Sequence, residues 1–261
     1  EAALESAVLL ETFGNAKTVY NDNSSRFGKW CAVYFDYKHK IAACQCNVYL
    51  LEKTRIIHAP PGERNYHIFY QMLCGAKTDG KKDIKALYDL LQACAPRGWQ
   101  DFNYTKDGLA NVDGVDDAKD YTESMSKLDV LGLGGEAQQR MMRLIAAVLC
   151  IGNLEFEKNT SATDDRLKVS NHDILNAVCS LLEVEASALE VKLTMRTVST
   201  KSSTYTVPLK KEQCYDTRDA LAKAVYAEMF EWIVGELNEA QKGDLSTNSA
   251  DDAQRFIGLL D

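Results

Sequence analysis

No apolar run in the 261 residues approaches the roughly 20 residues that a membrane-spanning helix needs. A positively charged and then apolar leader is also missing after Glu1. The sequence therefore predicts a cytoplasmic protein that does not insert into a membrane. The net charge of -8 is the opposite of what nucleic acids attract, so an acidic partner has to be met by a local basic patch.

No two of the eight cysteines form a Cys-x-x-Cys pair, and none has histidines at zinc-finger distances. This excludes the usual zinc sites and the disulfide framework of a small secreted domain. Because the cysteines lie in apolar segments, we expect buried, reduced thiols, which agree with a reducing compartment. They are Cys31, Cys44, Cys46, Cys74, Cys94, Cys150, Cys179 and Cys214.

The motif Gly-x-x-x-x-Gly-Lys-Ser/Thr is absent as well. In P-loop enzymes its backbone and its lysine hold the β- and γ-phosphates of the nucleotide. This chain therefore does not encode that part of a nucleotide site.

The composition is that of a folded protein, with 46% hydrophobic and 26% charged residues. Apolar spacing and alternation predict a mixed α/β, helix-rich fold. We expect Asn171, Ser187, and Thr217 or Asp216 to cap helices, and His67 to be a satisfied or exposed helix residue rather than a ligand. Helices are expected over 1–13, 63–73, 81–94, 136–150, 174–182 and 218–237, and strands over 30–35, 41–51 and 256–260.

Residues 21–29, with the sequence NDNSSRFGK, form a polar run directly before an expected strand. A serine oxygen can coordinate a hard cation, and an arginine pairs with a carboxylate or phosphate in a forked geometry. The polar run therefore suits a metal-bound phosphate. The alternative is a simple turn, in which serine and asparagine side chains bond to their own backbone.

Several other segments accompany the polar run in a fixed order. They are ETFGNAKT (11–18), YLLEKTR (49–55), ERNYHIFYQ (63–71), AAVLCIGNLEF (146–156) and RDALAKAVY (218–226). Together with the polar run, they resemble the motor domain of myosins nearly from end to end. A kinesin-like motor also carries an Asn-x-x-Ser-Ser-Arg switch, but the Gly28-Lys29 continuation and the other segments favour myosin.

The resemblance implies part of a P-loop NTPase-type motor domain, with strands of the central sheet and the largely helical upper subdomain. Residues 1–62 would hold switch I and sheet strands, 63–253 a helical actin-binding subdomain, and 254–261 the strand that leads into switch II. It implies an actin-activated ATPase with ATP and Mg²⁺ as cofactors, associated with the actin cytoskeleton. Light chains or calmodulin would bind regions outside this chain.

Family roles transfer to individual residues of the polar run. Ser25 would coordinate Mg²⁺, and Ser24 would position the attacking water and the γ-phosphate. Arg26 would form a salt bridge to a switch II glutamate that lies beyond this chain. The nucleotide-binding set would be Asn21, Asn23, Ser24, Ser25 and Lys29.

The chain's last residue, Asp261, follows an apolar strand. An aspartate at the carboxyl edge of a sheet can hold Mg²⁺ through water. In the myosin pattern, Asp261 would open switch II.

A basic segment, residues 191–211, contains five positive charges and no acidic residue. Its Thr, Val and Tyr content and Pro208 predict a projecting strand-like loop or hairpin. It is either a solvated face or a surface that meets an acidic partner. In myosins the matching loop contacts actin, which would assign that contact to Lys192, Arg196, Lys201, Lys210 and Lys211.

Ser203 stands in the basic segment where myosins carry an acidic or phosphorylatable residue that tunes the actin contact. Its phosphorylation would add about -1.5 to -2 charges among the lysines. Ser202 and Thr204 are alternative sites.

Since the phosphate loop is missing, we expect residues 1–261 to be inactive as an isolated ATPase. The alternative to a motor is a non-catalytic actin-binding relic, or an incomplete gene model of a myosin. The sequence leaves open the myosin class, its tail and cargo, and its direction and speed.

Overall fold

The computed structural model describes residues 2–36, 38–77, 79–109, 111–160, 165–200, 203–242 and 255–260. Helices predominate, and the strands form small antiparallel sheets, so the mixed, helix-rich fold is confirmed. The helices are α1 (Ala2–Gly14), α2 (Thr54–Ile57), α3 (His67–Gly75), α4 (Lys82–Cys94), η1 (Gly98–Asp101), α5 (Asp117–Val130), α6 (Glu136–Gly152), α7 (His172–Leu182), α8 (Ala186–Thr194) and α9 (Lys211–Ala240). The strands are β1 (Asn15–Ala16), β2 (Ser24–Ser25), β3 (Gly28–Phe35), β4 (Ile41–Tyr49), β5 (Phe156–Lys158), β6 (Leu167–Val169), β7 (Met195–Ser199), β8 (Thr204–Pro208) and β9 (Arg255–Leu260).

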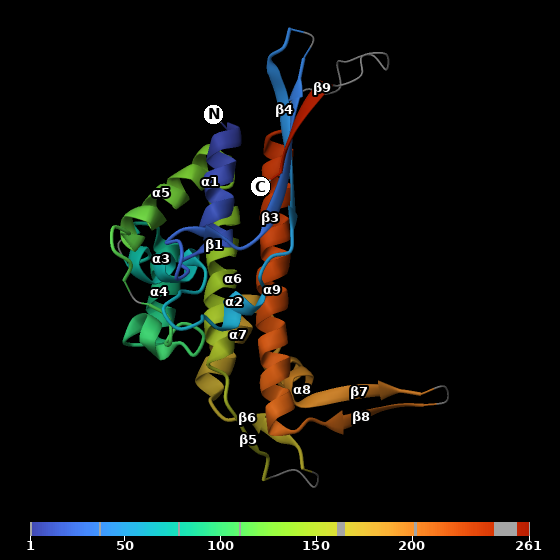
Figure 1. Cartoon of the computed structure of the whole chain (residues 1–261). Coiled ribbons are helices and arrows are strands. Elements are labelled where there is room, and N and C mark those ends of the chain that lie inside the picture. Colours follow the sequence, from blue (N-terminus) through green and yellow to red (C-terminus); the bar gives the residue numbers. More distant parts are fainter. Residues whose placement is uncertain are drawn as a thin grey trace.

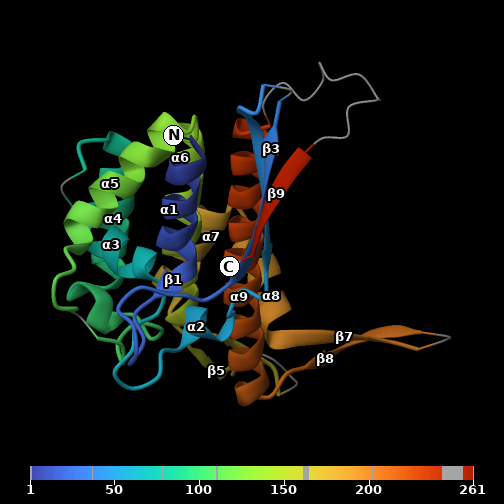
Figure 2. The same ribbon diagram turned by 45° about the horizontal axis from the view of Figure 1, so that its top comes forward.

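Two long helices, α6 and α9, run side by side through the centre of the molecule (Figure 1). The apolar spacing of α6 buries Met141, Ile145 and Val148 completely. Tyr226 of α9 stacks on Tyr66, with ring centroids 5.2 Å apart. Helices α1, α3, α4 and α5 gather on one side of this pair, and their buried faces complete the core (Figures 1 and 2).

A three-stranded antiparallel sheet, in the order β4-β3-β9, lies along the other side of α9 (Figure 2). The side chain of Asn238 on α9 fixes the edge of this sheet. It accepts a hydrogen bond from the Cys46 amide and donates one to the Cys46 carbonyl, both at 2.8 Å. The predicted strand pair over 30–35 and 41–51 is thus confirmed as a hairpin.

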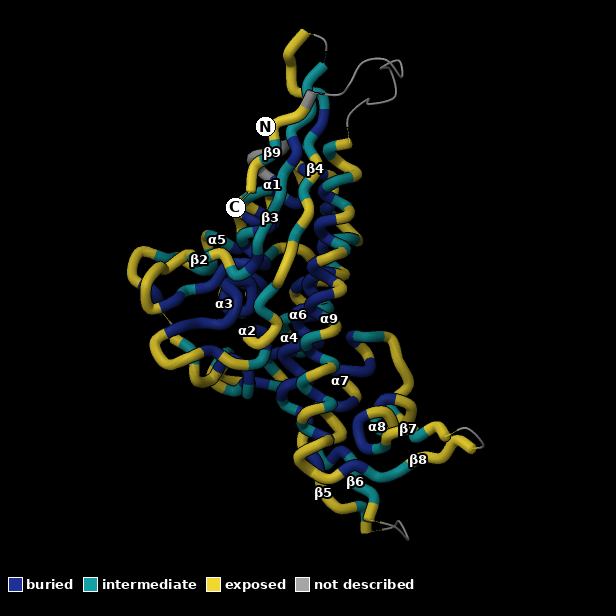
Figure 3. The backbone as a smooth tube through the Cα atoms, turned by 45° about the vertical axis from the view of Figure 1, so that its right-hand side comes forward, coloured by how far each residue is buried: buried dark blue, intermediate teal, exposed yellow. Residues whose placement is uncertain are grey.

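The second predicted hairpin is also confirmed. Strands β7 and β8 pair antiparallel, with Met195 opposite Pro208 and Ser199 opposite Thr204. The hairpin projects from the lower end of α9, and most of its residues are exposed (Figure 3). Exposure on both faces explains why its sequence is polar rather than strictly alternating.

Two predicted helix starts were wrong, because tertiary contacts use the residues that we expected to begin or cap helices. Helix α3 begins at His67, not at residue 63, since Arg64 donates to the Lys17 carbonyl (3.0 Å) and Tyr66 bridges to Ala16. Helix α9 begins at Lys211, where the Gln213 side chain accepts from the Lys210 amide (3.0 Å). Thr217 therefore lies inside α9.

Two predicted caps bond elsewhere. The Asn171 side chain accepts from the Glu155 amide (3.0 Å) and donates to the Asn153 carbonyl (2.7 Å) instead of capping α7. The capping box at Ser187 does not form, because α8 begins at Ala186 and Ser187 lies inside it; Glu190 accepts instead from the Val169 amide (2.7 Å).

The prediction of eight buried, reduced thiols was also wrong. Cys31 and Cys46 form a disulfide, because the register of β3 and β4 places them directly opposite each other, with Cα atoms 4.3 Å apart. Cys74 is exposed. The apolar setting of the cysteines could not reveal this register.

Candidate functional site

The polar run lies at the end of α1, where it is fixed on three sides. Strand β2 pairs with β1, so that Asn15 stands opposite Ser25 and Ala16 opposite Ser24. The Arg26 amide donates to the Gly14 carbonyl (2.9 Å), and the Arg26 carbonyl accepts from the Glu52 amide (2.9 Å). These backbone bonds hold Ser24, Ser25 and Arg26 in one defined conformation.

The two serine side chains have different partners. Ser25 is exposed, and its hydroxyl donates to Oδ1 of the buried Asn15 (3.1 Å). Because the proton points to Asn15, the hydroxyl lone pairs remain available to a cation. The Ser24 hydroxyl is half-buried and accepts from Arg26 Nη1 (3.2 Å).

Arg26 pairs with a carboxylate inside the chain. Its Nε donates to Glu52 Oε2 at 2.5 Å, and the same oxygen accepts from Arg55 Nε at 3.0 Å. Burial raises the pKa of the Glu52 carboxyl, but the hydrogen bonds from Arg55 and Arg26 outweigh this effect and leave that pKa below its ordinary value. The Arg26 side chain is 30% exposed, so it can also reach a group outside the chain.

The start of the polar run is a turn. Asn21 Oδ1 accepts from the Asn23 amide (2.8 Å), and the Asn21 carbonyl accepts from the Thr18 amide (2.8 Å). Asn23 Oδ1 in turn accepts from Asn15 Nδ2 (3.1 Å). The alternative interpretation of these residues as a turn thus describes their local structure, while the exposed side chains of Asn21 and Asn23 stay accessible.

Strand β9 brings its carboxyl end to the same edge of the sheet. Leu260 lies opposite Trp30, close to the point where Lys29 and Gly28 begin β3. Asp261 itself lies outside the described residues.

No group of three or more His, Cys, Asp or Glu side chains that could hold a metal occurs among the described residues. The polar run is different in kind, because it offers serine hydroxyls, asparagine amides and one guanidinium beside the Asp22 carboxylate and the Lys29 ammonium. Hydroxyl oxygens suit a hard cation and a guanidinium suits phosphate, so these residues fit a magnesium-bound nucleotide that supplies most of the cation's other ligands.

His67 differs from the satisfied or exposed helix residue that the sequence predicts. It is buried, and its Nδ1 has no hydrogen-bond partner among the described residues. Burial, assisted by the positive charge of Arg64, lowers the pKa of His67 to about 4. His67 is therefore neither exposed nor fully satisfied.

The basic residues lie far from the polar run along the chain and surround the β7–β8 hairpin. Arg196 is exposed on β7, Lys192 is exposed in the last turn of α8, and Lys210 and Lys211 are exposed at the start of α9. Lys201 lies outside the described residues. Ser203 is exposed at the turn, where its carbonyl accepts from the Thr200 amide (2.8 Å).

A family model, described as myosin head (motor domain), matches residues 1–261. The chain belongs to the myosin head family. This match removes the kinesin-like alternative. The helices within the described part of the chain are all too short or too polar to cross a bilayer.

The chain is similar to several curated myosins. It is 36% identical over 262 residues to unconventional myosin-Ib of Homo sapiens, covering all of this chain and 22% of that protein. It is 38% identical over 269 residues to myosin ID heavy chain of Dictyostelium discoideum, covering all of this chain and 23% of that protein. It is 38% identical over 263 residues to unconventional myosin-Vb of Rattus norvegicus, again along its whole length but over 13% of that protein. The chain thus spans a quarter or less of these relatives.

Two residues of the site were missed as site residues in the sequence. Glu52 is the partner of Arg26, and Asn15 orients the Ser25 hydroxyl. Both belong to segments that carry the family resemblance, 49–55 and 11–18. That shared membership was the available signal, because spacing along the chain does not predict either contact.

Proposed function

We propose that residues 1–261 are part of an actin-based motor ATPase and that the polar run is its switch I. The observation that supports this most is the convergence of two elements at one sheet edge. Ser24, Ser25 and Arg26 precede β3, and the last described residue of β9 lies opposite Trp30 in that strand.

Each side chain of the polar run has a separate task in this proposal. Ser25 would hold Mg²⁺ through the lone pairs that its bond to Asn15 leaves available. The Ser24 hydroxyl would orient water against the γ-phosphate, and Asn21, Asn23 and Lys29 would line the phosphates. Bound Mg²⁺ would neutralise charge on the phosphates, while the chain's own groups would chiefly position and exclude water. Asp261 would bind Mg²⁺ through water.

Arg26 gives the proposed site a closing contact. Its guanidinium is forked and partly exposed, and Glu52 already uses its Nε. A switch II carboxylate from outside this chain would compete for or share the guanidinium. Movement of Arg26 between these carboxylates would couple nucleotide contacts to a change in shape.

The test of switch I is steady-state ATP hydrolysis by the complete motor that contains these residues. We expect Arg26→Ala to lower kcat at least about 100-fold, as loss of a group that acts in the transition state does. Arg140→Ala is the matched control, because Arg140 lies on the exposed surface of α6 and its ion pair is with Glu136 in the same helix. Equal rates for the two variants would refute the assignment.

We further propose that the basic residues around the β7–β8 hairpin contact actin and that Ser203 regulates this contact. Lys192, Arg196, Lys201, Lys210 and Lys211 would face an acidic surface of the filament. The protein would then act in the cytoplasm on the actin cytoskeleton, with light chains or calmodulin bound to parts beyond this chain. Under phosphorylating conditions, an unchanged actin-activated rate in Ser203→Ala would rule out the regulatory role.

A further inference from the structure

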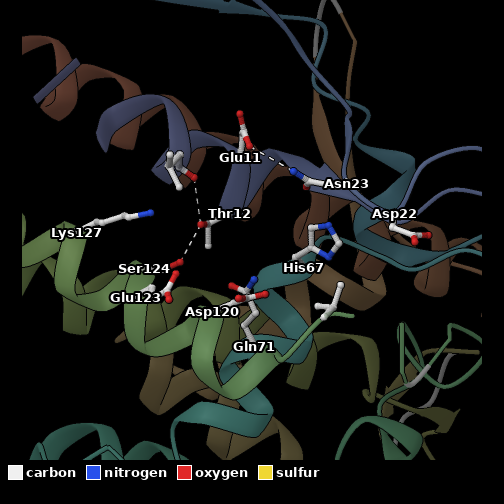
Figure 4. Close-up of a pocket in the computed structure, with 12 residues that line it drawn as sticks. Glu11, Thr12, Asp22, Asn23, His67, Gln71, Asp120, Glu123, Ser124 and Lys127 are labelled. Atoms are coloured by element: carbon white, nitrogen blue, oxygen red, sulfur yellow. Dashed lines mark hydrogen bonds between the residues drawn. The ribbon is translucent and has the colours of Figure 1, made fainter. Parts of the chain in front are cut away.

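A cavity of about 270 Å³ lies next to the polar run, between α1, α3 and α5, and opens to solvent (Figure 4). Asp22 and Asn23 of the polar run form part of its wall, and His67 and Gln71 of α3 form its floor. Of the residues that line this cavity, the proposed motor chemistry uses only Asn23. Its acidic lining opposes phosphate, so it differs in kind from the face that Ser24 and Arg26 present.

Two buried acceptor atoms line the cavity without a partner. His67 and Gln71 are only 6% and 5% exposed, and among the described residues nothing donates to His67 Nδ1 or Gln71 Oε1. His67 is neutral at pH 7, because its burial and Arg64 hold its pKa at about 4. A neutral imidazole has one acceptor nitrogen, and Nδ1 is that acceptor in the tautomer that carries its proton on Nε2. Buried acceptors without donors cost folding free energy, which a suitable ligand would recover.

The charge around these acceptors is negative. Glu11, Asp22, Asp120 and Glu123 line the cavity, and Lys127 is the cation among its lining residues. Burial and the neighbouring carboxylates of Asp117 and Glu123 raise the pKa of Asp120.

We propose that this cavity binds an organic nitrogen cation, an alkylammonium or guanidinium, whose N–H groups donate to His67 Nδ1 and Gln71 Oε1 while its charge faces Asp120. Each feature of the cavity requires one property of this ligand. The acceptors require donors, the carboxylates require positive charge, and the volume admits a group of the size of a lysine or arginine side chain. A metal ion is a poorer match, because the described residues offer no cluster of three metal-binding side chains.

Such a cation can come from two sources. It is either a free amine or guanidine, or a lysine or arginine side chain from a part of the protein beyond this chain. Both present the same group to the cavity. Because Asp22 and Asn23 border the cavity, its occupant would also restrain the start of the polar run.

The test follows the nitrogen of His67 directly. The chain contains four histidines, so a long-range ¹H–¹⁵N spectrum of histidine-labelled protein gives few signals. Methylguanidinium and butylammonium, titrated to roughly 20 mM as suits weakly bound small ligands, are expected to shift the His67 Nδ1 resonance and to leave His39, His58 and His172 unchanged. Tetramethylammonium has the same charge but no N–H group, so it is expected to cause no such shift.

Two variants test which carboxylates attract the cation. Asp120→Asn and, independently, Glu123→Gln are expected to weaken methylguanidinium binding about fivefold, whereas Asp113→Asn, in an exposed loop, is expected to have no effect. A His67 signal that ignores both probes, or that responds equally to tetramethylammonium, overturns the proposal.

The same spectrum of the complete motor distinguishes the two sources. If His67 Nδ1 already resonates at the shifted position and added probe causes no change, a side chain of the protein occupies the cavity. If it shifts only when the probe is added, the site takes a free cation. A signal at the unshifted position that also ignores the probe would contradict both.

Discussion

At the scale of single residues, the candidate site depends on one carboxylate shared by two arginines. Glu52 Oε2 accepts from Arg26 Nε and from Arg55 Nε, and Arg55 also pairs with Glu63 at 2.8 Å. Arg55 is buried, so loss of the Glu52 charge leaves it with one acidic partner. Glu52 therefore anchors the arginine that the proposed switch uses.

We expect Glu52→Gln to lower the free energy of unfolding at pH 7 by about 1 kcal/mol, because Gln keeps the shape but loses the charge, and solvent screens part of the effect. The folded-state pKa of Glu52 is below its ordinary value of 4.5. The contribution of the Glu52 carboxylate to the free energy of unfolding is therefore complete above pH 4.5 and is lost as the pH falls below that value.

Urea unfolding at pH 7 and at pH 3.5 measures this prediction. The difference in free energy of unfolding between wild type and Glu52→Gln should be smaller at pH 3.5 than at pH 7. Glu228→Gln, on the exposed face of α9, is the control. If wild type and Glu52→Gln have equal free energies of unfolding at pH 7, or if their difference is the same at both pH values, the role of Glu52 is contradicted.

At the scale of elements, the end of α1 sets the position of the polar run. Gly14 ends the helix, and its carbonyl accepts from the Arg26 amide (2.9 Å). Phe27 packs against this glycine and edge-on against Phe230, with ring centroids 5.2 Å apart. The helix end, the polar run and α9 therefore form one packed unit.

We expect Gly14→Ala to destabilise this unit by about 1–3 kcal/mol. A Cβ at residue 14 would lie 2.3 Å from the Phe27 ring, which is buried and cannot simply move aside. Gly80→Ala is the matched control, because an added Cβ there meets nothing within 4 Å. Thermal unfolding measures the effect, and Gly14→Ala should unfold at a lower temperature than Gly80→Ala. Equal unfolding midpoints would show that Phe27 moves aside without an energetic cost.

The sequence predicted the elements better than their ends and partners. Apolar spacing located α6, because its buried residues repeat along one stripe. It misplaced the starts of α3 and α9, where Arg64 and Gln213 bond to groups that the local pattern does not show. The family resemblance identified the polar run, but the partners Asn15 and Glu52 required the fold, since each contact depends on how distant segments pack.

At the scale of the whole molecule, the chain supplies one side of the proposed nucleotide site. The polar run and the carboxyl end of β9 meet at a sheet edge, while the basic hairpin projects from the lower end of α9 (Figure 1). The packed helices α6 and α9 run between these two regions. A motor needs this separation, because nucleotide and filament contacts have to be distinct but connected.

We expect purified residues 1–261 to show no ATPase activity above background with Mg²⁺ and ATP. They contain no Gly-x-x-x-x-Gly-Lys-Ser/Thr motif, so the backbone cradle and lysine that stabilise the transferred phosphoryl group are missing. A coupled phosphate-release assay, with the complete motor as the positive control, measures this. Clear turnover by the isolated chain that Arg26→Ala abolishes would contradict the expectation.

The most direct test of the central claim is an experimental structure of the complete motor with Mg²⁺ and a non-hydrolysable ATP analogue. The account predicts Ser25 Oγ at a coordination distance of about 2.1 Å from Mg²⁺, with Ser24 and Arg26 facing the terminal phosphate. A nucleotide that binds elsewhere, with all three side chains beyond hydrogen-bond reach of it, would contradict the account.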